Sequence, residues 1–315
     1  MALARAPQSG HRGEQKIIMA KPKPAPLPAG TAVGAYRVLR VLASGGSSIV
    51  YLGQTAEGHA VLLKEYLPAT LVVRPAGDRA PLVRPGALPR LRRGVQGFLD
   101  GARHLARLQQ PDLPSVLDCV QAHETVYLVL RYLEGRTLQD YIVAARGRRD
   151  GRCLSEACAI SVALDLLASL QRVHGAGLLH LDVKPSNVLL TLQGRLVLLD
   201  FDAALPMGQG VHTPAHTPGF SAPETLASPQ SHGPWTDIYA VGACLYASLL
   251  GHPPTPCSSR LADDPVPSAL RGLRGRYSPA LLDLVQRALS LPIGPRPQSA
   301  LEMAGALEAA AQSRA

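Results

Sequence analysis

The sequence predicts an α+β protein with two lobes: a small one built on an antiparallel β-sheet with one helix, and a larger, mainly helical one. Short apolar runs bounded by turn residues dominate residues 36–133, whereas residues 134–312 hold longer apolar stretches with helical spacing. The chain has 315 residues, which suits one two-lobed domain or two small domains, and 46% of them are hydrophobic, so it can bury a substantial core. We expect a cleft between the two lobes.

An N-terminal segment, residues 1–35, precedes the predicted small lobe and is rich in Pro, Ala, Gly and basic residues. Within it, the stretch KPKPAPLPAG at residues 21–30 favours an extended and unpacked chain. We therefore expect a disordered leader, in which Met19 is an alternative to Met1 as the true start.

A second change in composition occurs at residues 71–94, where arginines stand among prolines and glycines. We expect a long loop between the strand that carries Lys64 and the next helix. A solvated linker is the favoured interpretation, and docking of an acidic partner or a phosphorylated loop is the alternative. The arginines are Arg74, Arg79, Arg84, Arg90, Arg92 and Arg93.

Apolar spacing predicts two helices. In the segment 94–109, apolar residues recur at helical intervals and predict one buried face. The segment 153–177 predicts a longer helix that ends in glycines. The periodic residues of the first helix are Phe98, Ala102, Leu105 and Leu108.

The most informative stretch is HLDVKPSNVLLTLQGRLVLLDFD, residues 180–202. Two apolar runs, 188–190 and 196–199, flank a short segment that carries Gly194. This pattern predicts two antiparallel strands joined by a turn. A hairpin brings its two open ends together, so the residues just outside the strands become neighbours.

Those neighbours carry oxygen atoms. Asn187 precedes the first strand and Asp200 follows the second, so we expect them about one strand spacing apart, roughly 5 Å. Such donors suit a hard divalent cation such as Mg²⁺, which leaves its other positions to phosphates and water. Asp182, in the loop before Asn187, could accept a proton from an incoming hydroxyl.

In order and spacing, this stretch resembles the catalytic loop and metal-binding segment of the protein-kinase family, whose motifs run HRDxxxxN and then DFG. The resemblance extends over residues 36–312. VLASGGSSIVYLG, residues 41–53, resembles the glycine-rich phosphate loop, and Lys64 in AVLLKEYLP matches the strand lysine. YLVLRYLEG, residues 127–135, resembles the hinge whose backbone would bind adenine.

The second half of the chain resembles the family as well. TPGFSAPE, residues 217–224, is similar to the end of the activation segment, with APE at Ala222, Pro223 and Glu224. WTDIYAVGACLY, residues 235–246, resembles the buried central helix with its aspartate, here Asp237. Arg296 matches the arginine that pairs with the APE glutamate, and this pair is structural.

The resemblance is nearest to bacterial eukaryotic-like (Hanks-type) serine/threonine kinases. Lys184 lies two residues after Asp182, as in the serine/threonine group. KEYLP after the strand lysine and TPGF before APE are frequent in the bacterial members. Small-molecule phosphotransferases of related fold share the loop Asp, the Asn and the metal Asp, but they lack the lysine and the APE segment.

The resemblance implies a two-lobed kinase-like fold and transfer of the ATP γ-phosphate to Ser or Thr hydroxyls of protein substrates, with Mg²⁺ or alternatively Mn²⁺ as metal. Asp182 would take the hydroxyl proton while Lys184 steadies the phosphoryl group. Asn187 and Asp200 would hold the metal, and Lys64 would contact the α- and β-phosphates.

The remaining roles also follow from the resemblance. His180 and Phe201 are expected to be packing residues. Thr213 and Thr217 are possible phosphorylation sites, although Thr217 matches a position that supports the catalytic loop. The expected nucleotide-binding residues are Leu42, Ala43, Gly45, Gly46, Val50, Leu62, Lys64, Leu130, Tyr132, Leu133 and Leu189.

The most serious departure from the family pattern is Gly101, which stands where the family has the helix glutamate that holds the strand lysine. We expect Gly101 to face the cleft and Lys64 to lose its usual partner. Asp100 is turned by about 100° around the helix, so it could compensate only if the helix shifted. Gly101→Glu would raise activity if this loss limits the reaction.

Five further departures concern support and regulation. Ala43 and Ser48 replace two family glycines, which is tolerable if neither needs a positive φ. Leu62 replaces the alanine that lies on adenine. Leu181 replaces the HRD arginine, so we expect activity without an activation-segment phosphate contact. Asp202 replaces the DFG glycine and adds a carboxylate near the metal. A nucleotide-binding pseudokinase or scaffold is the alternative function.

Bulk properties exclude other classes. The formal charge of +9 could attract nucleic acid, but no nucleic-acid module is recognisable and scattered arginines are usually solvated. The 5 cysteines show no metal spacing and are expected to be reduced packing residues. No apolar run is long enough to span a membrane and no signal-peptide core is present, so we expect a cytoplasmic protein.

Overall fold

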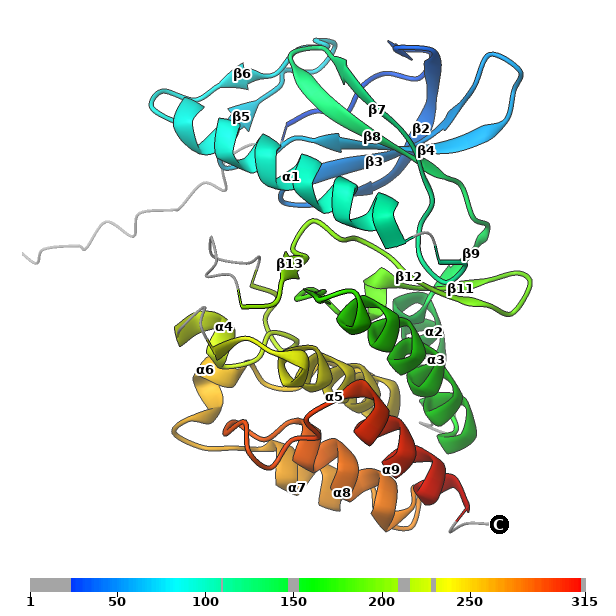
Figure 1. Ribbon diagram of the computed structural model, residues 1–315, viewed down its shortest axis with the longest axis vertical. Helices are drawn as coiled ribbons and strands as arrows, with labels where there is room; N and C mark the ends of the chain where they lie inside the picture. Colours follow the sequence, from blue (N-terminus) through cyan, green and yellow to red (C-terminus); the bar gives the residue numbers. More distant parts are fainter. Residues whose placement is uncertain (1–23, 109, 147–152, 209–215, 228–230, 313–315) are drawn as a thin grey trace, which may run out of the picture.

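The computed structural model describes residues 24–108, 110–146, 153–208, 216–227 and 231–312. A β-sheet with one long helix forms the upper lobe in Figure 1, and helices form the lower lobe. This arrangement confirms the predicted α+β fold with two lobes.

The upper, small lobe has six strands in one antiparallel sheet, in the order β1-β2-β3-β4-β8-β7. A separate pair of short strands, β5 and β6, lies next to it. The elements are β1 Ala32–Val33, β2 Tyr36–Ser44, β3 Ser48–Gln54, β4 Ala60–Tyr66, β5 Val72–Val73, β6 Leu82–Val83, α1 Leu88–Leu108, β7 Val116–Ala122 and β8 Thr125–Arg131.

The alternation of side chains along β4 divides the small lobe into two clusters. Lys64 lies opposite Val50 and Leu128, so these three side chains share one face of the sheet. Leu128 packs on this face with Phe98 of α1. The next residue, Glu65, points to the other face, where a second apolar cluster contains Leu27, Val33, Val38, Ile49, Leu63 and Val129.

Part of the expected leader is packed. Leu27 is 3% exposed and Val33 is fully buried, so the chain from residue 24 onward belongs to the small lobe. The backbone N–H of Leu27 donates to the Tyr51 hydroxyl at 3.1 Å. The expectation of an unpacked segment up to residue 35 is therefore wrong for residues 24–35, because apolar residues between the prolines reach the core.

The region 71–94 is more ordered than the predicted loop. β5 and β6 form a small hairpin, and α1 begins at Leu88, six residues before the expected helix start. Arg74 is 1% exposed and bonded to Glu65, so it does not belong to a solvated linker. The loop prediction rested on the overall composition of residues 71–94. Composition does not reveal that one of these arginines, Arg74, is the partner of the buried Glu65 carboxylate.

The lower, large lobe consists mainly of helices. Short strands at its top carry the hairpin that the sequence predicts. Its elements are β9 Gly135–Thr137, α2 Leu138–Arg146, α3 Glu156–Gly175, β10 Leu178–Leu179, the 3₁₀ turn Pro185–Asn187, β11 Val188–Thr191, β12 Leu196–Leu198, β13 Leu205–Pro206, α4 Glu224–Ala227, α5 Pro234–Leu250, α6 Cys257–Arg260, α7 Val266–Arg271, α8 Pro279–Ala288 and α9 Ala300–Gln312.

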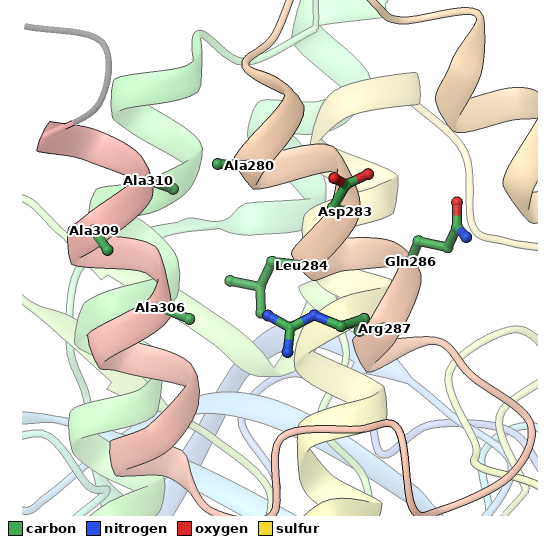
Figure 2. Close-up of a pocket in the computed structure, with 8 residues that line it drawn as sticks. All are labelled: Ala280, Asp283, Leu284, Gln286, Arg287, Ala306, Ala309 and Ala310. Carbon is green, nitrogen blue, oxygen red and sulfur yellow. The ribbon is translucent and has the colours of Figure 1, made fainter.

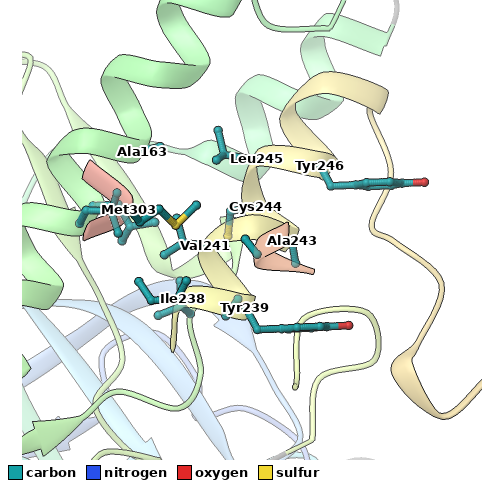
Figure 3. Packing of buried hydrophobic residues seen from close by; sticks show 14 of the residues in the cluster. Ala163, Ile238, Tyr239, Val241, Ala243, Cys244, Leu245, Tyr246 and Met303 are labelled. Atoms are coloured by element: carbon teal, nitrogen blue, oxygen red, sulfur yellow. The ribbon is translucent and has the colours of Figure 1, made fainter. Parts of the chain in front are cut away.

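Helix α5 is the centre of this lobe. Every residue from Thr236 to Leu249 is buried, as expected of a helix that is apolar around its whole circumference. Figure 3 shows its side chains together with Ala163 of α3 and Met303 of α9. Within the described ranges, no helix is both long and apolar enough to cross a lipid bilayer.

Candidate active site

The hairpin β11–β12 brings together the two predicted metal ligands. Val188 pairs with Leu198, and the ladder continues by one bond from the Leu199 N–H to the Asn187 carbonyl, 2.7 Å long. Asp200 follows directly and has a φ of 65°, a left-handed conformation that turns the chain out of the strand. Asn187 and Asp200 therefore lie at the same end of the hairpin.

Asp182 is the centre of a hydrogen-bond network in the same place. Its Oδ2 accepts from Lys184 Nζ at 2.7 Å and from Asn187 Nδ2 at 3.1 Å, and its Oδ1 accepts from the Thr217 hydroxyl at 2.9 Å. Its side chain is 9% exposed. These bonds fix the orientation of the carboxylate, as a catalytic base requires.

A buried carboxylate supports the loop before Asp182. Asp237 on α5 accepts from the backbone N–H groups of His180 and Leu181, at 2.9 and 2.8 Å, and interacts with His174 at 2.8 Å. Burial acts to raise the pKa of Asp237, but the hydrogen bond and charge of His174 together with the charge and backbone N–H of His180 outweigh it and lower that pKa. Asp237 holds Leu181 at a φ of 60°, next to Asp182.

Packing around this loop agrees with the roles expected for two neighbours. His180 is completely buried, and its ring contacts Phe201 edge to face with 4.7 Å between centroids. His180 Nε2 lies 3.0 Å from the Leu199 carbonyl, so the imidazole links the loop that carries Asp182 to the segment before Asp200.

Lys64 enters the site from β4 and has two carboxylate partners. Its Nζ lies 2.6 Å from Asp200 Oδ1 and 2.7 Å from Asp202 Oδ2. Burial acts to lower the pKa of Lys64, but the two carboxylates outweigh burial and raise it. The expectation that Lys64 would lose its partner is therefore wrong, because Asp202 supplies a carboxylate from outside the helix.

Gly101 faces this cluster from α1, as the helical periodicity predicts, and is buried with Phe98, Ala102 and Leu105. Asp100 points elsewhere, since its carboxylate binds Gln96 Nε2 at 2.9 Å and Arg103 Nη1 at 2.5 Å on the exposed side. Sequence reasoning missed Asp202 as the Lys64 partner. The sequence did contain one indication of this pairing: the chain lacks the family's helix glutamate at Gly101 and has an extra carboxylate at Asp202.

The loop between β2 and β3 has a defined backbone. Neither Ala43 nor Ser48 has a positive φ, so the lost glycines cause no backbone strain. The carbonyls of Gly46 and Ser47 accept from the N–H groups of Ala69 and Leu67, at 2.9 and 2.8 Å. The segment after Lys64 thus supports the loop that would cover the phosphates.

Sheet register places several expected nucleotide contacts on one face. Val50 lies opposite Lys64, and Leu62 lies opposite Leu130, so all four side chains point to the same side as α1. Leu62 is half-buried. The other expected contacts lie nearby along the chain: Leu42 and Ala43 in β2, Gly45 and Gly46 in the following loop, Tyr132 and Leu133 after β8, and Leu189 on β11.

The activation-segment end is held by a buried ion pair. Arg296 donates from Nη1 and Nη2 to the two oxygens of Glu224 at 2.7 and 3.0 Å, as the family resemblance implies. The Thr236 hydroxyl also donates to Glu224 at 2.9 Å. Thr217 bonds Asp182 from this segment, whereas Thr213 lies outside the described residues.

Figure 2 shows a hollow elsewhere, between α8 and α9. Its lining combines alanines with the exposed Asp283 and the neighbouring Arg287. None of these residues belongs to the network around Asp182.

The chain is similar in sequence to known protein kinases. A family model described as the protein kinase domain matches residues 95–273. The chain is 27% identical over 288 residues to the probable serine/threonine-protein kinase CPE1738 of Clostridium perfringens, covering 87% of this chain and 38% of that protein. It is 28% identical over 298 residues to the serine/threonine-protein kinase pkn3 of Myxococcus xanthus, covering 89% of this chain and 50% of that protein.

The chain thus spans half or less of the length of these two curated relatives. Among solved structures, the apo form of PpkA-294 is similar, with a TM-score of 0.73 and 28% identity. That match covers 90% of this chain and 99% of the other, so it includes both lobes.

Proposed function

This chain belongs to the protein kinase family and resembles its bacterial serine/threonine members, and we propose that it transfers the γ-phosphoryl group of ATP to serine or threonine hydroxyls of protein substrates. A protein kinase domain uses ATP and a divalent metal. The assignment of Mg²⁺ as that metal belongs to the proposal, as do the roles of individual residues.

The convergence of Lys184, Asn187 and Thr217 on the Asp182 carboxylate carries the proposal. An aspartate that served only in a turn would need one such bond. Here a lysine that could bind a phosphoryl group and an amide that could bind a metal share the same carboxylate. This combination supports phosphoryl transfer, which depends on positioning and on neutralising charge.

Each residue has a distinct role in this reaction. Asp182 would orient the substrate hydroxyl and accept its proton as the oxygen attacks the γ-phosphorus and the bond to the ADP oxygen breaks. Lys184 would stabilise negative charge on the phosphoryl oxygens. Lys64 would hold the α- and β-phosphates, and the loop at Gly45 and Gly46 would cover them.

The metal ligands fit Mg²⁺ by their chemistry. Asn187 and Asp200 offer hard oxygen atoms, and the Asn187 amide nitrogen already donates to Asp182, so the amide oxygen is the atom left for a cation. A bound Mg²⁺ would neutralise charge on the phosphates.

The test is transfer of label from γ-labelled ATP to a generic serine/threonine protein substrate. Asp182→Asn should lower the turnover number by about 10²–10⁴-fold, the usual contribution of a general base. Asp200→Asn should remove the metal-dependent reaction. Asp283→Asn, at an exposed aspartate of α8, is the control and should behave as wild type.

Two outcomes would contradict the proposal. Equal labelling by the wild type and by Asp182→Asn would refute the assignment of the base. A folded wild type that binds ATP but transfers no label with any divalent metal would make the chain a pseudokinase.

A further inference from the structure

Lys64 has a second carboxylate partner, Asp202, that none of the roles proposed above uses. We propose that Asp202 positions Lys64 in place of the absent helix glutamate, and that Gly101 provides the space that this arrangement requires. The inference rests on the proposed function, because it assigns a positioning residue to the same reaction.

The two carboxylates on Lys64 are not equivalent in that reaction. Asp200 lies at the hairpin end beside Asn187, where a metal would bind it. Asp202 approaches the same ammonium group at 2.7 Å and its side chain is 28% exposed. If Asp200 were to bind a metal, Asp202 would remain as the carboxylate that could hold Lys64 toward the phosphates.

The surroundings of Lys64 restrict it to this position. The ammonium nitrogen lies 5.7 Å from the centre of the Phe98 ring on α1, which adds a cation–π contact. Lys64 is 6% exposed overall, so its charge needs nearby compensation. Asp202 supplies that compensation from the segment after the hairpin, whereas the family uses a helix residue.

Gly101 explains why the helix carries no carboxylate here. A Cβ atom built on Gly101 would lie 2.7 Å from the Phe201 carbonyl oxygen and 3.6 Å from the Asp202 Cα. The first distance is too short for a real contact, and the atom it meets belongs to the backbone. Helix α1 therefore touches the Phe201–Asp202 backbone directly, at the point where a glutamate would begin.

The same contact corrects the expectation for Gly101→Glu. The substitution places a side chain against the Phe201 carbonyl, so it should lower activity in an otherwise unchanged chain. In this chain the carboxylate stands at position 202, and the helix lacks the side chain that would collide with the Phe201 carbonyl.

Removal of the Asp202 carboxylate is the first test. Asp202→Asn and Asp202→Ala should lower kcat/KM for ATP by about 10²-fold, because a misplaced Lys64 misorients the phosphates. Asp202→Glu, which keeps the charge, should retain more activity than Asp202→Asn. Asp100→Asn removes a carboxylate from the exposed side of α1 and should match wild type. Wild-type kcat/KM in both Asp202→Asn and Asp202→Ala would overturn the inference.

An exchange of partners is the second test. Asp202→Gly alone and Gly101→Glu alone should each lose activity. The double variant restores the family's residues at both positions, and the glycine lets the backbone move away from the new side chain. Activity above that of Asp202→Gly is the expected result. If the double variant folds but its activity falls by the product of the two single-variant losses, the proposed exchange of carboxylate partners is wrong.

A readout without transfer separates this inference from the proposed function. Thermal stabilisation by Mg·ATP should be weaker in Asp202→Asn than in wild type, while both melt at similar temperatures without nucleotide. If wild type transfers no phosphoryl group but this difference is found, the proposed function fails and the role of Asp202 stands. If wild type transfers and Asp202→Asn matches it in both assays, only the inference fails.

Discussion

Glu65 and Arg74 form an ion pair in which neither side chain is exposed. Two bonds join them, from Arg74 Nη1 to Oε1 at 2.5 Å and from Nη2 to Oε2 at 2.8 Å. The hydroxyls of Tyr51 and Tyr127 donate to the same carboxylate at 2.7 and 2.6 Å. Because Glu65 follows Lys64 on β4, this network fixes the back of the strand whose front carries Lys64.

Loss of Arg74 should destabilise the small lobe strongly. Arg74→Met leaves the Glu65 carboxylate buried without its cation, which typically costs about 3–5 kcal/mol of unfolding free energy. Urea denaturation of the purified protein would measure the change. Arg92→Met, at an exposed position of α1, is the matched control and should change stability little. Equal stability of Arg74→Met and wild type would contradict the structural role of this pair.

Asp237 should make stability depend on acid pH. Its pKa is lowered in the folded state, since the interactions with His174 and His180 together outweigh burial. Its contribution is therefore present above the unfolded aspartate pKa of about 3.9 and is lost as pH falls through the lower folded value. Asp237→Asn should be much less stable than wild type near neutral pH, and the difference should shrink in acid.

Denaturation of both proteins over a series of pH values checks this. A stability difference that stays constant down to acid pH would show that the charge of Asp237 contributes nothing. The variant should also lose activity, because the N–H groups of His180 and Leu181 would face an amide that can place an N–H donor against them.

Leu62 should control access to the adenine site. It is half-buried and lies on the same face of the sheet as Lys64, Val50 and Leu130. The larger side chain of Leu62→Trp should occupy the space where adenine would bind. The variant should therefore lose thermal stabilisation by Mg·ATP while its sheet stays folded. Leu117→Trp, at an exposed position of β7, is the control. Undiminished ATP binding by Leu62→Trp would exclude this face as the base site.

The cysteines should divide into two groups by reactivity. Cys119 and Cys158 are exposed, whereas Cys153, Cys244 and Cys257 are buried, and all five thiols are free. Burial raises the pKa of Cys244 and Cys257, which lowers their thiolate content further. A maleimide should label two cysteines in the native protein and all five after denaturation. Rapid native labelling of Cys244 would contradict the packing of α5.

Local patterns predicted the parts of the site that depend on neighbours along the chain. The hairpin that joins Asn187 to Asp200 follows from two apolar runs and a turn, because strand pairing decides which ends meet. The Glu224–Arg296 pair was accessible only through the family resemblance, since 72 residues separate its members. The two-lobed fold followed from the change of apolar spacing along the chain.

Tertiary contacts explain what the sequence did not reveal. The partner of Lys64 could not be predicted because it depends on how closely α1 approaches Phe201, which no periodicity encodes. Arg74 was hidden among exposed arginines for a similar reason. One signal was present: Glu65 and Lys64 are adjacent in a strand, so one of them must point into the covered face and needs a buried partner.

Phosphoryl transfer by this chain is measured most directly by the intact mass of the purified protein after incubation with ATP and Mg²⁺, followed by identification of the modified residue type. Wild type should gain phosphoryl groups on serine or threonine, and Asp182→Asn should gain none, although both bind ATP. If wild type binds ATP but neither its own mass nor the mass of added protein substrates increases, the proposed phosphoryl transfer is contradicted.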